Sequence, residues 1–158
     1  MSIEVRRATP EDAVTIAEFA LKLFAQHRDY DPDRFADLGD LEGARRFYGE
    51  RCDADDAAIL IAERDGRPLG YAYLEYEAVN YADLLESVAW LHDIFLERNA
   101  RDIGGGKILM DAAIATAKEL GAERMVLHTA SQNATGKEFF ERAGFRTSMY
   151  EMMLKLTD

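Results

Sequence analysis

Cysteine is nearly absent from this sequence: Cys52 is the only one among 158 residues. A single cysteine cannot form an intramolecular disulfide, and a lone cysteine in a reducing compartment is usually an inert thiol. The three histidines, His27, His92 and His128, are too scattered to suggest a metal cluster. The chain is therefore expected to work without a disulfide, a metal or a catalytic cysteine.

Long apolar runs and a leader sequence are also missing. No apolar stretch approaches the length that crosses a bilayer. Residues 1–7 lack the basic stretch, the apolar stretch and the small-residue cleavage site of a signal peptide. No membrane partner is expected, and the expected location is cytoplasmic.

Basic residues are scarce relative to acidic ones. The 19 Lys and Arg against 30 Asp and Glu give a formal net charge of -11. Nucleic-acid binding depends on neutralising phosphates with Lys and Arg, so no nucleic-acid partner is expected. The same charge suits a cationic small molecule or a basic peptide, and it equally suits a well-solvated acidic surface.

The apolar pattern predicts one α/β (α+β) domain over residues 1–158. Strands are predicted over 3–6, 58–62, 69–76, 88–96, 125–128 and 145–156, and helices over 10–27, 41–52, 104–120 and 134–143. Thr9 is the expected N-cap of the first helix, and Asp65-Gly66 is typical of a hairpin turn. The nearly continuous apolar strand over 88–96 is expected at the centre of the sheet.

The most informative feature is the run Arg101-Asp102-Ile103-Gly104-Gly105-Gly106-Lys107, between an apolar strand and an amphipathic helix. The first N–H groups of a helix lack helical partners, and the helix dipole places positive charge there. The glycines permit close approach, and a basic residue stands at each end of the run. This pattern predicts a phosphate site; a glycine turn that binds nothing is the alternative.

Two other phosphate-binding motifs fit this run poorly. A Walker loop requires Ser or Thr after the lysine, where this chain has Ile108. A dinucleotide-binding fingerprint requires a small residue at the position of Leu109.

Arg101-x-x-Gly104-x-Gly106 resembles the Arg/Gln-x-x-Gly-x-Gly/Ala signature of the GNAT superfamily, the acyl-CoA-dependent N-acyltransferases. Residues 133–145, Asn-Ala-Thr-Gly-Lys-Glu-Phe-Phe-Glu-Arg-Ala-Gly-Phe, are similar to the second motif of that family. With the element order, the likeness covers most of the chain and is strongest over 91–145. It implies a GNAT-type mixed, largely antiparallel central sheet of six to seven strands flanked by about four helices.

The same resemblance implies acetyl-CoA as the cofactor. Amides of residues 101–107 would hold the pyrophosphate of coenzyme A, and backbone near Ile94, Phe95 and Leu96 would pair with the pantetheine arm. Asn133 would contact that arm from the other side. In this family the strand of the first motif splays from the next strand, so that the cofactor lies in the gap as an additional strand.

One position of the second motif departs from the family. Many relatives protonate the leaving thiolate with a tyrosine, but this chain has Phe140 at that position beside the cofactor. Tyr150, on the predicted last strand, is a substitute donor; a tyrosine that only packs there is the alternative. A thiol with a pKa near about 8.5 is a tolerable leaving group, so an acid helps without being essential. A binding or sensor module for acyl-CoA with little or no catalysis is the competing hypothesis.

Candidates for the general base lie on two predicted strands. The strand Leu91-His92-Asp93-Ile94-Phe95-Leu96 is similar to the Leu-Glu-Asp-x-x-Val strand of polyamine-type acetyltransferases, with His92 in place of Glu. An imidazole suits a base at neutral pH. Glu75 and Glu77 share one face of a neighbouring predicted strand and could hold or deprotonate an amine through water. For each candidate, a packed or solvated side chain without a catalytic role is the alternative.

Together these features predict an N-acetyltransferase that moves acetyl from acetyl-CoA to a primary amine by direct attack in a ternary complex. The expected acceptor is a small cationic molecule or a peptide amine. Its pocket is expected to be built by the segments 30–52 and 79–87. The sequence is compatible with a homodimer.

Overall fold

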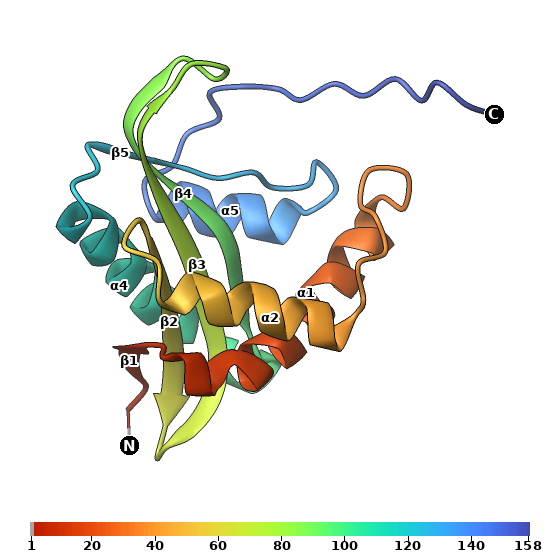
Figure 1. Cartoon of the computed structure of the whole chain (residues 1–158). Coiled ribbons are helices and arrows are strands. Elements are labelled where there is room, and N and C mark those ends of the chain that lie inside the picture. The colour runs from red at the N-terminus through yellow and green to blue at the C-terminus, as the bar shows by residue number, and fades with distance from the viewer. Residues whose placement is uncertain (1) are drawn as a thin grey trace.

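The computed structural model describes residues 2–158, and Figure 1 shows the whole chain. Its five strands are β1 (Glu4–Arg7), β2 (Ala57–Arg64), β3 (Arg67–Asn80), β4 (Leu85–Leu96) and β5 (Arg124–Val126). They form one mixed sheet in the order β1-β2-β3-β4-β5, in which only the β4–β5 pair is parallel. The helices are η1 (Pro10–Asp12, a 3-10 turn), α1 (Ala13–Tyr30), α2 (Leu41–Cys52), α3 (Arg98–Arg101), α4 (Gly105–Glu119) and α5 (Ala134–Arg142).

The helices cover both faces of the sheet (Figure 1). Because successive strand residues point to opposite faces, β2 supplies both apolar clusters. Ile59 and Ile61 pack with α1 and α2, whereas Leu60 packs with Leu109 and Met110 of α4. The α/β class is therefore confirmed, with a helical layer on each side of the sheet.

Several local predictions are confirmed. Thr9 is the N-cap of η1, and α4 begins within the glycine run, at Gly105. Arg64 pairs with Arg67 across the Asp65-Gly66 turn, and both turn residues have positive φ, as a tight hairpin requires. The strand over 88–96 lies within β4, between β3 and β5.

The prediction of a last strand over 145–156 is wrong. These residues belong to no strand, and no backbone hydrogen bond joins 146–158 to another part of the described chain, 2–158. After α5 the chain runs away from the sheet (Figure 1). The sequence does have strand-like alternation there, but alternation alone does not supply a neighbouring edge with which to pair.

The element count also differs from the expected six to seven strands and about four helices. The sheet has five strands because the terminal segment does not join it. The additional helix is α3, a single turn of four residues directly after β4. A single turn is too short for apolar residues to recur at helical spacing, so the sequence pattern could not reveal this helix.

A charged cluster fixes the beginning of the first helix. The Asp12 carboxylate accepts hydrogen bonds from the Thr9 backbone N–H at 2.8 Å and from the Arg6 guanidinium at 2.9 Å. Arg6 also bonds Glu63 on β2 at 3.2 Å. The hydrogen bond from Arg6 holds the pKa of Asp12 below its ordinary value. The cluster therefore ties β1, β2 and the helix start together.

Replacing Asp12 with Asn is expected to lower the free energy of unfolding at pH 7 by about 1 to 2 kcal/mol, because charge-assisted hydrogen bonds are lost. A depressed carboxyl pKa stabilises the fold above the unfolded pKa, and the stabilisation disappears as pH falls through the folded pKa. In urea denaturation, the difference between wild type and Asp12→Asn should therefore shrink below about pH 4. Glu11→Gln is the matched control; an equal loss in this variant, or a loss independent of pH, would contradict the assignment.

Candidate functional site

Strands β4 and β5 separate after three residue pairs. Val88 to Trp90 pair with Arg124 to Val126, and within the described residues 2–158 no strand pairs with β4 on that side beyond Trp90. On its other side β4 stays paired with β3 as far as Leu96. Residues 91–96, which include Ile94, Phe95 and Leu96, therefore present an edge without a strand partner on that side, although the carbonyl oxygen of Leu96 accepts a hydrogen bond from Arg101 Nε.

A β-bulge lies at the start of this open edge. Tyr73 pairs with Asp93 and Leu74 pairs with Leu91, so His92 is the additional residue of β4. The extra residue of a bulge shifts by one position the alternation of side chains between the two faces of the sheet. As a result the neighbouring residues His92 and Asp93 both point to the face that carries α1 and α2.

Asp93 anchors this face. Its carboxylate accepts a hydrogen bond from the Tyr48 hydroxyl at 2.5 Å and from the Tyr71 hydroxyl at 3.0 Å. Burial raises the pKa of Asp93, and the two hydroxyl donors oppose that rise. Burial and the nearby Asp93 charge raise the pKa of Tyr48 and of Tyr71, so both remain donors at neutral pH. The trio joins the bulge to α2 and β3.

In the sequence Asp93 stands only as a member of the strand segment 91–96, with no role assigned to it. Two adjacent residues of a strand can point to the same face only if one of them is the extra residue of a bulge. The His92-Asp93 pair was therefore the signal of the bulge. The tyrosine partner on α2, Tyr48, gave no comparable signal because the contact spans 45 positions of the chain.

His92 is exposed and lies in a row of aromatic rings. Its ring centroid is 5.1 Å from that of Tyr73 and 6.1 Å from that of Trp90, to which it is nearly parallel. The ring centroid of Trp90 is in turn 5.3 Å from that of His128. Trp90 Nε1 is buried without a hydrogen-bond partner among the described residues. The row places an accessible imidazole next to the open edge of β4.

Glu75 is held by two partners. Its carboxylate accepts from the Tyr73 hydroxyl at 2.7 Å and from Arg51 Nη2 at 3.1 Å. Arg51 also bonds Asp56 at 3.2 Å. This carboxylate is therefore ion-paired, whereas the imidazole of His92 makes no polar contact with the described residues.

The glycine run packs more tightly than a simple phosphate loop requires. Gly104 has φ +83°, and a Cβ atom there would meet nothing within 4 Å. A Cβ on Gly105 would lie 2.6 Å from the carbonyl oxygen of Ala100, and one on Gly106 would lie 3.0 Å from the ring of Phe139. Gly104 allows the turn, and the other two let the first turn of α4 approach α3 and α5.

The helix start that results fits a phosphate group. The first N–H groups of α4 have no helical partner, and the surface at Gly104 is open. Arg101 donates from Nε to the carbonyl oxygen of Leu96 at 2.8 Å, so it links the turn to the end of β4. Lys107 is exposed and pairs with Asp111 at 2.7 Å. Asp102 and Ile103 are exposed on the same turn.

Asn133 is the N-cap of α5. Its Oδ1 accepts from the Gly136 backbone N–H at 2.9 Å and from the Tyr30 hydroxyl at 3.2 Å. A Cβ on Gly136 would lie 2.3 Å from Asn133 Nδ2, so a larger residue there would require the Asn133 side chain to move. Oδ1 is thus committed to the protein, and the amide N–H groups are the part that can meet a ligand.

The two residues considered for thiolate protonation lie in different surroundings. Phe140 is half-buried on α5 and packs against Phe139 and Phe145, with ring centroids 5.4 and 6.1 Å away. Tyr150 lies in the exposed terminal segment outside the sheet, not on the predicted strand. The structure therefore does not bring Tyr150 into the row of rings around His92.

Other kinds of site find no support in the described part of the chain. No group of three or more His, Cys, Asp or Glu side chains between residues 2 and 158 is arranged to hold a metal ion. None of the helices described there is both long and apolar enough to span a bilayer. Burial raises the pKa of the Cys52 thiol to about 11, so it is protonated at neutral pH.

Comparison with known proteins agrees with this geometry. The sequence profile of the acetyltransferase (GNAT) family matches residues 21–145. The uncharacterized N-acetyltransferase YhfO of Bacillus subtilis (strain 168) is 30% identical over 145 residues, which cover 90% of this chain and 89% of that protein.

Solved structures show the same fold. A mutant form of the BH1408 protein from Bacillus halodurans superposes with a TM-score of 0.84 at 17% identity, covering 98% of this chain and 99% of that one. The aminoglycoside N-acetyltransferase AAC(6')-Iy, bound to the bisubstrate analogue CoA-S-monomethyl-acetylneamine, superposes with a TM-score of 0.79. The sequence identity is 19%, and the match covers 100% of both chains.

Substitution of Asp93 tests the anchoring of the bulge. Asp93→Ala leaves two buried tyrosine hydroxyls without their acceptor, so the free energy of unfolding should fall by about 2 to 3 kcal/mol. In the triple variant Asp93→Ala, Tyr48→Phe, Tyr71→Phe, the loss of unfolding free energy should be smaller than the sum of the losses in the three single variants, because the three groups act as one network. Urea denaturation of the full set measures this; strictly additive costs would contradict the network.

Proposed function

This chain belongs to the acetyltransferase (GNAT) family, and from that premise we propose which of its residues bind the cofactor, activate the amine and select the acceptor. It is an acyl-CoA-dependent N-acetyltransferase that uses acetyl-CoA. The observation that carries the proposal is the open edge of β4 over 91–96. An exposed His92 stands at one end of this edge, and the N-terminus of α4 follows its other end.

Coenzyme A is proposed to bind along this edge. Within residues 101–107, the amides of the first turn of α4 hold its pyrophosphate, because these N–H groups are unpaired and open, whereas those of Arg101, Asp102 and Gly104 already donate to carbonyl oxygens. The backbone of 94–96 pairs with the pantetheine arm as a further strand would. Asn133 donates from its amide nitrogen to the arm, and Phe140 contributes apolar contact from α5. When bound, acetyl-CoA supplies the thioester from which the acetyl group is taken.

His92 is proposed as the general base. A primary ammonium with a pKa near about 10.4 must lose a proton before it can attack a carbonyl. The exposed imidazole can take that proton directly or through a water, whereas Glu75 is already paired with Arg51. The backbone N–H groups near Leu96 stabilise the charge that develops on the carbonyl oxygen during direct attack. Glu75, whose carboxylate is already paired with Arg51, then positions the acceptor amine and does not deprotonate it.

The thiolate is proposed to leave without an acid from the second motif. Phe140 has no proton to give, and Tyr150 lies on the exposed terminal segment, which joins no strand of the sheet. A thiol is a tolerable leaving group at neutral pH. Tyr150 remains a proposed donor only for an arrangement in which that segment covers the site.

The acceptor is proposed to be a small cationic amine. The partly exposed Trp90 and the half-exposed Phe47 present rings on the α1/α2 side, next to the buried ring of Tyr73 and the carboxylate of Glu75. Aromatic faces and carboxylates both attract ammonium groups. The bisubstrate complex of AAC(6')-Iy, which contains an acetylneamine group, supports a small amine as the acceptor class.

Replacing His92 with Ala is expected to lower turnover about 100-fold or more while the affinity for acetyl-CoA stays unchanged. Thiol release with an accepted amine gives turnover, and calorimetry gives affinity. His92→Glu should recover part of the turnover, because a carboxylate can accept the same proton. His128→Ala is the matched control, since it removes the other imidazole beside Trp90. Turnover at the wild-type level in His92→Ala would remove His92 from the mechanism.

A panel of amines separates the enzyme from a pure binding module. Polyamines, aminoglycosides, amino acids and peptide N-termini should be tested with acetyl-CoA for thiol release. Release is expected with at least one small polycationic amine. Binding of acetyl-CoA without release for any acceptor would favour the module, and absence of acetyl-CoA binding would contradict the whole proposal.

A further inference from the structure

One hydrogen bond joins the end of α1 to the start of α5. The hydroxyl of Tyr30, the last residue of α1, donates to Asn133 Oδ1 at 3.2 Å, across 103 positions of the chain. Within residues 2–158 no other hydrogen bond connects α1 with α5 or with its N-cap. The link between these two helices therefore depends on a single phenol group.

This bond lies at the open edge of β4. α1 packs on one face of the sheet, whereas α5 packs together with α4 on the other face. Helices in opposite layers can touch only where no strand lies between them. α5 follows β5 in the chain, and β5 ends at Val126, so this place is the gap beside residues 91–96. Tyr30 and Asn133 thus meet where the proposed cofactor lies.

The end of α1 holds Tyr30 in a fixed position. The next residue, Asp31, donates its backbone N–H to the carbonyl oxygen of His27 at 3.1 Å. Its carboxylate oxygen Oδ1 accepts from the backbone N–H groups of Asp33 and Arg34, each at 3.2 Å. The chain is therefore fastened on both sides of Tyr30, and its ring is presented from a rigid helix end.

The bond from Tyr30 decides which part of Asn133 can meet a ligand. An amide oxygen has two lone pairs, and an amide nitrogen carries two donors. The Gly136 backbone N–H occupies one lone pair of Oδ1 at 2.9 Å, and the Tyr30 hydroxyl occupies the other. Nδ2 bonds to no side chain or backbone group within residues 2–158 and is not buried. Asn133 is thereby a hydrogen-bond donor toward any ligand in the gap.

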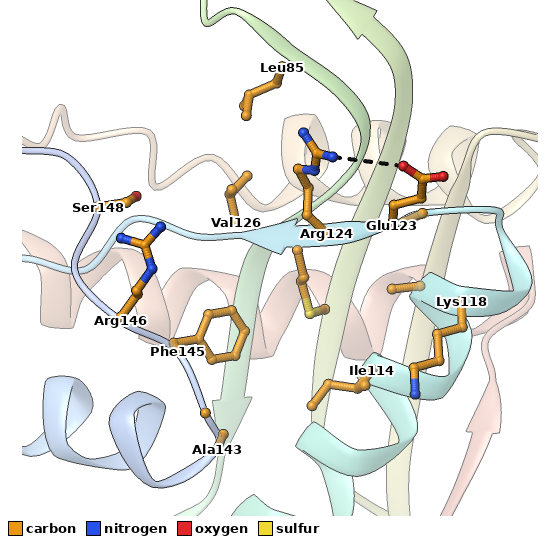
Figure 2. A pocket seen from close by; sticks show the side chains of 14 residues that line it. Leu85, Ile114, Lys118, Glu123, Arg124, Val126, Ala143, Phe145, Arg146 and Ser148 are labelled. Carbon is orange, nitrogen blue, oxygen red and sulfur yellow. Dashed lines mark ion pairs between the residues drawn. The ribbon is translucent and has the colours of Figure 1, made fainter.

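The other end of α5 gives this amide no support. It borders a pocket of about 540 Å³, which Figure 2 shows beside β5. The lining of the pocket comes from Leu85 and from the segments 114–126 and 143–148, and it includes no residue of α1 or α2. Because α5 has nine residues, this end is about 13 Å from Asn133. The orientation of the amide therefore depends on contacts at its own end of the helix.

We propose that Tyr30 is a positioning residue for the cofactor: its hydroxyl holds Asn133 Oδ1 so that the amide N–H groups face the pantetheine arm of coenzyme A. Without that hydroxyl one lone pair of Oδ1 is free, and the amide is held by Gly136 alone. The inference rests on the proposed contact between Asn133 and the arm. It concerns binding and not the chemical step, because the hydroxyl proton of Tyr30 is committed to Asn133.

Tyr30→Phe removes the hydroxyl and keeps the ring. In calorimetry its Kd for acetyl-CoA is expected to rise about 3- to 10-fold, the effect of one lost hydrogen bond. Its Kd for the coenzyme A fragment that ends at the pyrophosphate should not change, because this fragment lacks the arm. Turnover at saturating acetyl-CoA should also stay at the wild-type value.

Tyr76→Phe is the matched control, because its hydroxyl lies beside Gly121 and bonds to none of the described residues. An equal rise of Kd for acetyl-CoA and for the fragment would indicate a general structural role and would overturn the inference. A fall in turnover at unchanged affinity would overturn it as well, since the hydroxyl would then act in the chemical step.

A double-mutant cycle separates this inference from the cofactor site itself. Asn133→Ala alone is expected to weaken acetyl-CoA binding, and adding Tyr30→Phe to it should cause little further loss, because the hydroxyl acts through that amide. Additive losses would overturn the inference and leave the proposed cofactor site intact. Wild-type affinity in Asn133→Ala would instead contradict the proposed contact with the arm, and the role of Tyr30 would fall with it.

Discussion

The unequal pairing of β4 is the constraint on which the rest of the structure depends. On one side β4 is hydrogen-bonded to β3 along almost its whole length, and on the other it is bonded to β5 over three residue pairs. The first pairing makes the strand rigid, and the second leaves its later half with free backbone groups. A rigid strand with an open edge is what a ligand that binds as an extra strand requires. The proposed cofactor position follows from that asymmetry.

Close packing on the β3 side keeps this edge in place. A Cβ atom on Gly70 would lie 2.1 Å from the carbonyl oxygen of Phe95, so only glycine permits the approach of the two strands there. The bulge at His92 and the bonds from Tyr48 and Tyr71 to Asp93 then orient the acceptor face. Substrate-facing and cofactor-facing groups are thus set by one strand, and a change at Asp93 is expected to affect both.

Local patterns were enough to predict much of this architecture. The Asp65-Gly66 hairpin, the N-cap at Thr9 and the helix after Gly104 were readable because each depends on neighbouring residues. The bulge was missed because register is decided by the partner strand, and Tyr48 was missed because its contact is long-range. The terminal strand was wrong for a related reason: residues 145–156 have the right alternation, but pairing depends on the path of the chain after α5, and that path leads away from the sheet (Figure 1).

The central claim is that the open edge of β4 is where acetyl-CoA lies, and hydrogen–deuterium exchange with and without acetyl-CoA tests it most directly. Peptides covering 91–96 and 103–107 are expected to exchange more slowly when acetyl-CoA is present, because the ligand occupies their free N–H groups. The hairpin between β2 and β3, around Asp65-Gly66, should exchange at the same rate in both states. Unchanged exchange over 91–96 despite saturating acetyl-CoA would contradict the account.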